Sequence, residues 1–453
     1  MDKKKSIILI IIFFIVSVLP GGVYFFIGEY VDVKNYENRT LSLKPVFTIK
    51  NYETFPMEYE SYYNDNIPFR NQLIKLNNSI DYFIFKQSSS DDVVIGKDGW
   101  LFYRGDTNPV KQSMGYWELF TDKKLETIAD NLMSSKKILE SMGIEFVLYI
   151  APNKETIYKE KIPDYYKLKS EKTCTDQLVN YLKENTDIRV VYPKEELLQA
   201  KSENTDRLLY HKLDTHWNYA GGYIGAVSLA KELGKNMPSI DFVDIEPFYS
   251  STGDLTGMLN ISIKDGDLDY NVSDKKSLKT ENKKYDFDTE FIYHTPGADP
   301  RTLFVRRDSF STALAPFIAT QFENSILIHS TSFDKQQIFD YKSDIFVYET
   351  VERFIGNLEE FRISFISSYV EDINSGDMKN IVINSVINNI GNIYVSISKK
   401  CGTSGESKQI YNFKLLEKTM KLQVPEDETG EIYIDVYRDK FQKDLLEQVT
   451  IQY

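Results

Sequence analysis

An aspartate and a histidine lie two residues apart at Asp214 and His216, and Trp217 and Asn218 follow them directly. The chain contains only four histidines, so each can be judged by its own surroundings. A histidine can act as a general base because its pKa lies near neutrality. A neighbouring aspartate can orient the ring and stabilise the imidazolium. The pattern predicts the base half of a catalytic site; the alternative is a helix-capping aspartate beside a structural histidine.

Ser309 is the candidate nucleophile, because a serine hydroxyl reacts readily once a base accepts its proton. It lies between a predicted strand, Thr302 to Arg306, and a predicted helix, Ser311 to Phe322. Backbone N–H groups at such a strand-to-helix junction favour a negatively charged oxygen. The alternative is that Ser309 only caps the helix.

Asn153 follows another predicted strand, Ile144 to Ala151, and should lie at the same edge of the sheet as Ser309. It is a candidate oxyanion donor, although a turn residue is the simpler interpretation. The adjacent Lys154 and Glu155 are expected at the surface or at the sheet edge.

No metal site or other cofactor is predicted. Asp214, His216 and His211 match no spacing known for zinc ligands. The two cysteines, Cys174 and Cys401, lie far apart and provide neither a metal-binding spacing nor a disulfide framework.

Predicted helices alternate with short apolar strands from about residue 121 to residue 348. This alternation predicts an α/β fold with a mainly parallel sheet and helices on both faces. Asp265 to Lys284 is polar and charged, which indicates a surface excursion. After about residue 360, short apolar or alternating runs separated by polar turns predict a small β-sandwich or jelly roll.

The N-terminus predicts a membrane anchor. Lys3 to Lys5 precede 21 residues without charge, from Ile7 to Ile27, and about 20 are needed to cross a bilayer. Positive charge before the span places the N-terminus in the cytoplasm and the rest outside. A cleaved signal peptide is the alternative. A net charge of −13 argues against nucleic acid as a partner but does not exclude a neutral polysaccharide.

Several segments together resemble the alginate O-acetyltransferase family, also called DHHW proteins, which have an SGNH-hydrolase-like domain. The matching segments are Asn64 to Arg70, Gly96 to Tyr103, Asp214 to Asn218, Arg307 to Phe310 and Ser343 to Arg353. The resemblance implies a triad of Asp214 as orienting acid, His216 as base and Ser309 as nucleophile. The family commonly has glycine where this chain has Arg307, which would put a cation near the oxyanion or the substrate.

The resemblance also implies an activity and partners. Family members transfer acetyl groups to hydroxyls of exported polysaccharides, often with a membrane-bound O-acyltransferase that supplies the acetyl group. We therefore expect a membrane-anchored, extracytoplasmic O-acetyltransferase that works through an acetyl-serine. The alternatives are an acetylesterase with the same triad and a non-catalytic glycan-binding or assembly protein.

The expected domain organisation has four parts. Residues 1–28 form a cytoplasmic stub and transmembrane anchor, and 29–95 an extension packed on the core. Residues 96–358 form the SGNH-like catalytic domain with its parallel sheet, and 359–453 a C-terminal β-sandwich that some relatives use to bind carbohydrate.

Overall fold

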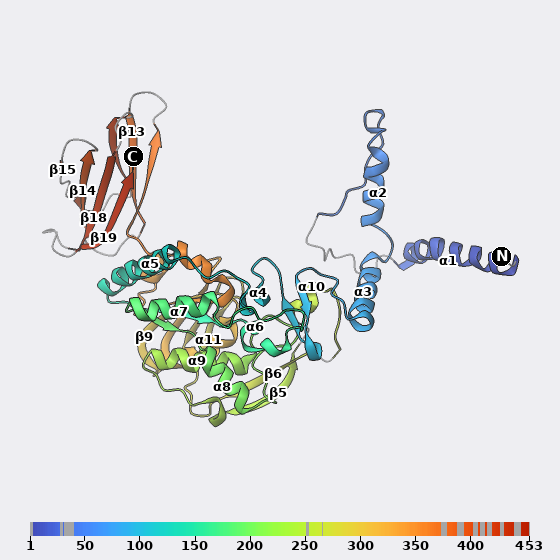
Figure 1. The fold of residues 1–453 in the computed structure, drawn as a ribbon, viewed down its shortest axis with the longest axis horizontal. Coiled ribbons are helices and arrows are strands. Elements are labelled where there is room, and N and C mark those ends of the chain that lie inside the picture. Colours follow the sequence, from blue (N-terminus) through green and yellow to red (C-terminus); the bar gives the residue numbers. More distant parts are fainter. Residues whose placement is uncertain are drawn as a thin grey trace.

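The computed structural model describes residues 3–27, 30, 40–250, 253–264, 266–372, 378–386, 394–401, 406–407, 413–414, 419–425, 430–438 and 445–452. A seven-stranded sheet in the order β4-β3-β11-β9-β10-β8-β7 forms the centre of the α/β body. Figure 1 shows this body, with α5, α7, α9 and α11 labelled around β9. The strands are β3 (Glu145–Ala151), β4 (Arg189–Val191), β7 (Glu281–Tyr285), β8 (Glu290–His294), β9 (Asp299–Arg307), β10 (Phe322–His329) and β11 (Ile345–Val351).

The sheet is mainly parallel, as predicted, but β8 runs against both of its neighbours, so the sheet is mixed and not purely parallel. Neighbours from β4 to β10 run parallel, whereas β8 lies antiparallel to both β10 and β7. The antiparallel pairing of β7 with β8 follows from their short connection, in which Asp286 Oδ1 accepts the backbone N–H groups of Asp288 and Thr289 at 3.0 and 3.1 Å. So short a turn can join only antiparallel strands.

Helices cover both faces of the sheet, as predicted. Alternate residues of β3 point to opposite faces: Val147 and Tyr149 join one apolar core, and Phe146 and Leu148 join the other. The first core includes α8 (Lys194–Glu203), α9 (Tyr219–Glu232) and α11 (Ser311–Ile318); the second includes α5 (Asp122–Ser141) and α7 (Cys174–Asn185).

Shorter elements surround the sheet. They are the hairpin β1 (Val93–Ile95) and β2 (Leu101–Tyr103), the antiparallel pair β5 (Asp244–Ser250) and β6 (Asp267–Ser273), and the helices α4 (Pro109–Ser113), α6 (Lys154–Ile157), α10 (Asp254–Met258) and α12 (Gln336–Asp340). The predicted surface excursion is wrong for β6, because Asp267 and Asp269 are buried. Backbone N–H groups of neighbouring segments bind both carboxylates.

The C-terminal part contains two antiparallel β-sheets, which lie beyond α5 in Figure 1. One contains β12 (Ile366–Asp372), β13 (Met378–Ser385) and β17 (Thr419–Pro425); the other contains β14 (Tyr394–Cys401), β15 (Glu406–Ser407), β16 (Phe413–Lys414), β18 (Gly430–Tyr437) and β19 (Leu445–Gln452). Buried apolar side chains come from both sheets, such as Ile381 from the first and Ile397 and Ile434 from the second.

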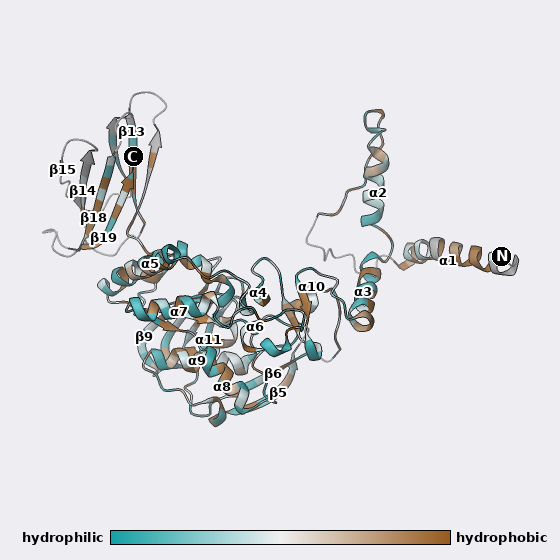
Figure 2. Ribbon diagram, in the orientation of Figure 1, coloured by the Kyte–Doolittle hydropathy of each residue, from teal (hydrophilic) through white to brown (hydrophobic). Residues whose placement is uncertain are grey.

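Three helices form the N-terminal part: α1 (Lys3–Ile27), α2 (Phe55–Asp65) and α3 (Arg70–Ile80), the last continued by a π-helical turn, Asp81–Phe85. In the described part of the chain, one stretch is long and apolar enough to cross a membrane, Ser6–Ile27 of α1. Figure 2 shows α1 as a largely hydrophobic helix that stands apart from the α/β body.

Candidate active site

Ser309 lies in the turn between β9 and α11, as the sequence predicted. The carboxylate of the preceding Asp308 fixes this turn: its Oδ1 accepts the N–H of Phe310 at 2.8 Å and its Oδ2 accepts the N–H of Val351 at 2.6 Å. The N–H of Asp308 donates to Glu349 Oε2 at 2.6 Å. Burial and the neighbouring Asp308 carboxylate raise the pKa of Glu349 well above its ordinary value. The serine therefore stands on a turn bonded to the adjacent strand β11.

Asp214 and His216 lie on a loop that closes on itself. Tyr210 and Trp217 pair as an isolated antiparallel bridge, and His211 N–H donates to His216 C=O at 3.2 Å. The loop then enters α9, where the Asn218 side chain caps the helix by accepting the N–H of Gly221 at 3.1 Å. A Cβ at Gly221 would lie 2.2 Å from the Leu209 carbonyl, so this close approach requires glycine.

The structure brings Asp214, His216 and Ser309 into one hydrogen-bonded line. His216 Nε2 lies 2.7 Å from Ser309 Oγ, and His216 Nδ1 lies 2.6 Å from Asp214 Oδ1. The same Asp214 oxygen accepts the backbone N–H of His216 at 2.9 Å, which holds the ring beside its own aspartate. This is the geometry in which a histidine can take a serine proton while a carboxylate stabilises the resulting charge.

A second carboxylate, Asp254, supports the first. Its N–H donates to Asp214 Oδ2 at 2.9 Å, and its own carboxylate accepts from Thr215 N–H at 2.8 Å and Thr215 Oγ1 at 2.6 Å. Asp254 Oδ2 lies 3.9 Å from His216 Nδ1. Sequence reasoning missed Asp254, because an aspartate that begins a short helix after Gly253 is a common capping pattern without a distinctive spacing.

Asp214, His216 and Asp254 could each offer one ligand atom to a metal ion, since these atoms lie within 4.8 Å of one another. Both oxygens of Asp214 already accept protein hydrogen bonds, from His216 and from Asp254 N–H. The Asp214 oxygens are thus engaged within the protein, which favours Asp214 as the hydrogen-bond partner of His216 over Asp214 as a metal ligand.

The electrostatics suit a charged Asp214–His216 pair. Burial alone would raise the pKa of Asp214, but the hydrogen bond and charge of His216 outweigh it and hold that pKa well below its ordinary value. Burial likewise acts to lower the pKa of His216, whereas the hydrogen bond and charge of Asp214 raise it above 6.5 overall. The pair therefore stabilises the imidazolium that forms when the ring accepts a proton.

Lys154 lies beneath this loop and not at the surface, which corrects the sequence prediction for it and for Glu155. Both side chains are buried. Lys154 Nζ donates to the carbonyl of Asp214 at 2.6 Å and to those of His211 and Lys212 at 3.2 and 3.4 Å. Burial lowers the pKa of Lys154. Hydropathy could not reveal this position, because it depends on three carbonyls from a distant segment.

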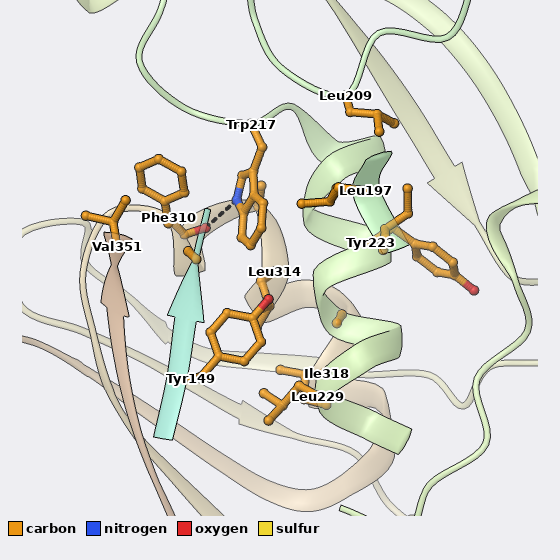
Figure 3. Close-up of a cluster of buried hydrophobic side chains, with 14 of the residues drawn as sticks. Tyr149, Leu197, Leu209, Trp217, Tyr223, Leu229, Phe310, Leu314, Ile318 and Val351 are labelled. Atoms are coloured by element: carbon orange, nitrogen blue, oxygen red, sulfur yellow. Dashed lines mark hydrogen bonds between the residues drawn. The ribbon is translucent and has the colours of Figure 1, made fainter. Parts of the chain in front are cut away.

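Trp217 joins the loop to the nucleophile turn. Its indole Nε1–H donates to the backbone carbonyl of Phe310 at 2.8 Å, and the two rings pack at 5.4 Å between centroids (Figure 3). Both side chains are fully buried. The residue that follows the histidine in sequence thus contacts the residue that follows the serine, which fixes the two halves of the site relative to each other.

The two residues proposed for the oxyanion or substrate, Asn153 and Arg307, do not line the cavity at Ser309. Asn153 is fully buried, where its Nδ2 donates to Gln112 Oε1 at 3.0 Å and its N–H donates to Glu352 Oε2 at 2.9 Å. Arg307 is also buried; its guanidinium packs 3.9 Å from the Phe291 ring centroid and donates to Phe287 C=O at 2.7 Å. Each side chain is therefore held by these partners and is not directed into the cavity.

A cavity of about 210 Å³ opens at the serine. Its lining residues are His211, Asp214, His216, Trp217, Tyr219, Asp269, Phe287, Ser309, Phe310, Thr312 and Ala313. The buried Thr312 hydroxyl, three residues after Ser309, has no hydrogen-bond partner within the described part of the chain. Sequence reasoning missed His211, Asp269 and Thr312 as cavity residues, because their positions depend on how β6 and α11 pack.

Residues 93–286 match the family model described as the SGNH hydrolase-like domain of the acetyltransferase AlgX. This part of the chain is therefore similar to the SGNH-like domain of that acetyltransferase. The matched range contains Asp214 and His216 and ends before Ser309. The resemblance predicted from the sequence motifs is thereby confirmed.

Two curated relatives are probable alginate O-acetylases AlgJ. The protein from Pseudomonas fluorescens is 24% identical over 181 residues, which are 40% of this chain and 42% of the relative. The protein from Pseudomonas aeruginosa is 22% identical over 187 residues, which are 41% and 43% of the two chains. The match thus spans less than half the length of these relatives.

Two solved structures are also similar. Bacillus cereus PatB1 aligns with a TM-score of 0.43 and 18% identity over 60% of this chain and 99% of its own. The O-acetyltransferase domain of Pseudomonas putida AlgJ aligns with a TM-score of 0.39 and 16% identity over 60% and 93% of the two chains.

Proposed function

We propose that the protein is an O-acetyltransferase that moves acetyl groups onto hydroxyls of an exported polysaccharide through an acetyl-Ser309 intermediate. The observation that carries the proposal is the continuous line from Asp214 through His216 to Ser309 Oγ, with the serine facing a cavity. The match to an acetyltransferase domain and the similarity to alginate O-acetylases support the choice of acetyl as the transferred group.

The proposed reaction has two halves. His216 Nε2 accepts the Ser309 proton as Oγ attacks the carbonyl carbon of an acetyl ester. The bond between that carbon and the donor oxygen then breaks, and His216 passes the proton to the leaving oxygen. Acetyl-Ser309 remains. A sugar hydroxyl then gives its proton to His216 and attacks the acetyl carbon, and Ser309 Oγ leaves with the proton returned by the histidine. The low pKa of Asp214 keeps it ionised opposite the imidazolium in both halves.

Negative charge develops on the acetyl oxygen in both halves and needs hydrogen-bond donors. The N-terminus of α11 and the Thr312 hydroxyl, which lines the cavity, are the proposed donors. They replace Asn153 and Arg307 in this role, because those side chains are bonded elsewhere.

We propose that α1 anchors the protein with residues 29–453 outside the cell membrane; the apolar length of Ser6–Ile27 supports this. The proposed division remains an anchor at 1–28, an extension at 29–95, a catalytic domain at 96–358 and a β-sandwich at 359–453. Buried side chains from both C-terminal sheets support the sandwich, for which carbohydrate binding is the proposed role. The proposed donor partner is a membrane-bound O-acyltransferase, as the family resemblance implied.

The test uses the full-length protein in detergent, with p-nitrophenyl acetate as donor and neutral glycan oligomers as acceptors. Mass spectrometry follows the acetylated protein, acetylated oligomers and free acetate. The parent should gain one acetyl group on Ser309 and pass it to the oligomers. Ser309→Ala and His216→Ala should do neither, whereas the exposed-site control Ser332→Ala should match the parent.

The outcomes separate the alternatives. Acetate without acetylated oligomers would identify an acetylesterase, in which water replaces the sugar as acceptor. Ser309→Ala and His216→Ala variants that match the parent would remove the triad from the chemistry. Glycan binding without any acetylated protein would identify a non-catalytic binding protein.

A further inference from the structure

One wall of the cavity consists of side chains that the proposed acetyl-transfer steps do not use. His211, Tyr219, Asp269 and Phe287 line the cavity together with Ser309 and His216. They come from the loop before α9, from α9, from β6 and from the β7–β8 turn. This wall, here called the acceptor wall, therefore borders the reacting serine without belonging to the triad.

The polar part of the acceptor wall is His211 with its flanking carboxylates. The ring Nε2 lies 3.7 Å from Asp269 Oδ2, and Nδ1 lies 4.0 Å from Asp267 Oδ2. Both distances exceed a good hydrogen bond, and the buried Nδ1 has no partner in the described part of the chain. Because Nδ1 is buried, Nε2 is the ring atom that can bind a hydroxyl in the cavity, beside Asp269 Oδ2.

Asp269 is itself fixed in place. Its Oδ1 accepts the N–H groups of Tyr219 at 2.9 Å and Tyr270 at 2.8 Å. These bonds leave Oδ2 beside His211, where it can accept from a hydroxyl or an amine. The rings of Tyr219 and Phe287 add apolar surface next to these polar atoms, which suits the mixed surface of a sugar ring.

No lysine or arginine is among the residues that line the cavity. The nearby Lys154 ammonium is buried and donates to loop carbonyls, and the Arg307 guanidinium donates to the carbonyl of Phe287, behind the wall. Arg353 packs its guanidinium 5.3 Å from the Phe310 ring centroid and is not among the lining residues. An acidic sugar placed on the acceptor wall would face Asp269 with no lysine or arginine in the cavity lining to pair with it.

We infer that His211 and Asp269 form the acceptor subsite and that this subsite selects neutral or amino sugars and rejects uronates. The inference rests on the proposed function, because it names the acceptor for the same acetyl-Ser309. His211 and Asp269 bind a sugar hydroxyl or amine while a neighbouring hydroxyl attacks the acetyl carbon. The carboxylate of a uronate is repelled by Asp269 at short range.

The test compares three acceptors with p-nitrophenyl acetate as the donor: neutral glucan oligomers, glucosamine oligomers and mannuronate oligomers. The parent should acetylate the neutral or amino oligomers at least about tenfold faster than the mannuronate oligomers. Raising the salt concentration should narrow this ratio, because ions screen the repulsion. Equal or faster acetylation of mannuronate would overturn the inference.

Asp269→Asn is the matched variant, because the amide oxygen can still accept from Tyr219 and Tyr270 while the charge is removed. The ratio of mannuronate to neutral acetylation should rise about tenfold in this variant, and the ratio cancels any general loss of activity. Asp340→Asn, which removes an equal charge from an exposed site on α12, should keep the parent ratio. A ratio of mannuronate to neutral acetylation that is unchanged in Asp269→Asn would overturn the inference. If that variant does not fold, the salt series on the parent decides: a preference for neutral oligomers that does not change with salt would overturn the inference. Absence of acetyl-Ser309 in the parent would refute the proposed function instead.

Discussion

The buried ammonium of Lys154 makes the sharpest prediction, because it joins the loop of Asp214 and His216 to the first turn after β3. Lys154→Met keeps the length of the side chain and removes its three hydrogen bonds to the carbonyls of His211, Lys212 and Asp214. A hydrogen bond from a charged donor contributes about 1.5–3 kcal/mol. The variant also removes the penalty of burying an ammonium, which is several kcal/mol and which the lowered pKa of Lys154 reflects.

The loss of these bonds outweighs the relieved penalty, because the carbonyls of His211 and Asp214 lose the one donor they have in the described part of the chain, whereas that of Lys212 still accepts the N–H of Leu101 at 2.8 Å. We expect Lys154→Met to lower the free energy of unfolding by about 2 kcal/mol, that is, about 1 kcal/mol for each of the two unpaired carbonyls. Acylation should also slow at least about tenfold, because displacement of the Asp214–His216 loop misaligns the base with Ser309.

The assay is urea unfolding followed by tryptophan fluorescence, together with the initial burst of p-nitrophenol from p-nitrophenyl acetate. The three tryptophans, Trp100, Trp117 and Trp217, all lie in the α/β part, so fluorescence reports on the region in question. Lys161→Met is the control: its ion pair with the exposed Asp98 lies at the surface, where such pairs add little to stability. If Lys154→Met unfolds and acylates like the control, the loop is held by other contacts and the reasoning fails.

Three further predictions concern the triad and its supports. Asp214→Asn should reduce turnover about 10⁴-fold, because an amide neither fixes the required tautomer nor stabilises the imidazolium; steady-state turnover within tenfold of the parent would contradict this. The burst rate of the parent should rise with pH through a midpoint above 6.5, because the base must be neutral and Asp214 raises the pKa of His216. A pH–rate profile with its midpoint at or below 6.5 would contradict a raised pKa of His216. Trp217→Phe removes the indole donor to the buried carbonyl of Phe310 and should destabilise the protein by about 1–3 kcal/mol, as measured by urea unfolding; a stability equal to that of the parent would show that this bond contributes nothing.

Local signals in the sequence identified much of the framework. The long apolar strand at 145–151 and the helix at 122–141 are visible as patterns of spacing, and they predicted an α/β layer structure with helices on both faces. Ser309 was identifiable because a strand and a helix meet there, and Asp214 with His216 because histidine is rare in this chain.

The missing parts depend on contacts between distant segments. Asp254 and Asp269 resemble ordinary polar residues in sequence, and their roles follow from bonds to the loop at 214–219. Lys154 has the composition of a surface residue but donates to carbonyls about 60 positions away. The antiparallel pairing of β7 with β8 follows from one short turn at Asp286, which periodicity alone does not distinguish from a loop.

The position of β9 within the sheet determines when Ser309 reaches its final position during folding. β9 pairs with β10 on one side and with β11 on the other, and both of these strands follow it in the chain. A folding intermediate can therefore contain the complete Asp214–His216 loop, and Ser309 itself, before the serine turn gains its anchor on Val351. Such late, non-local closure delays reactivity until the sheet is complete. Covalent labelling of Ser309 by a fluorophosphonate would thus report the end of folding, whereas circular dichroism would register the helices earlier.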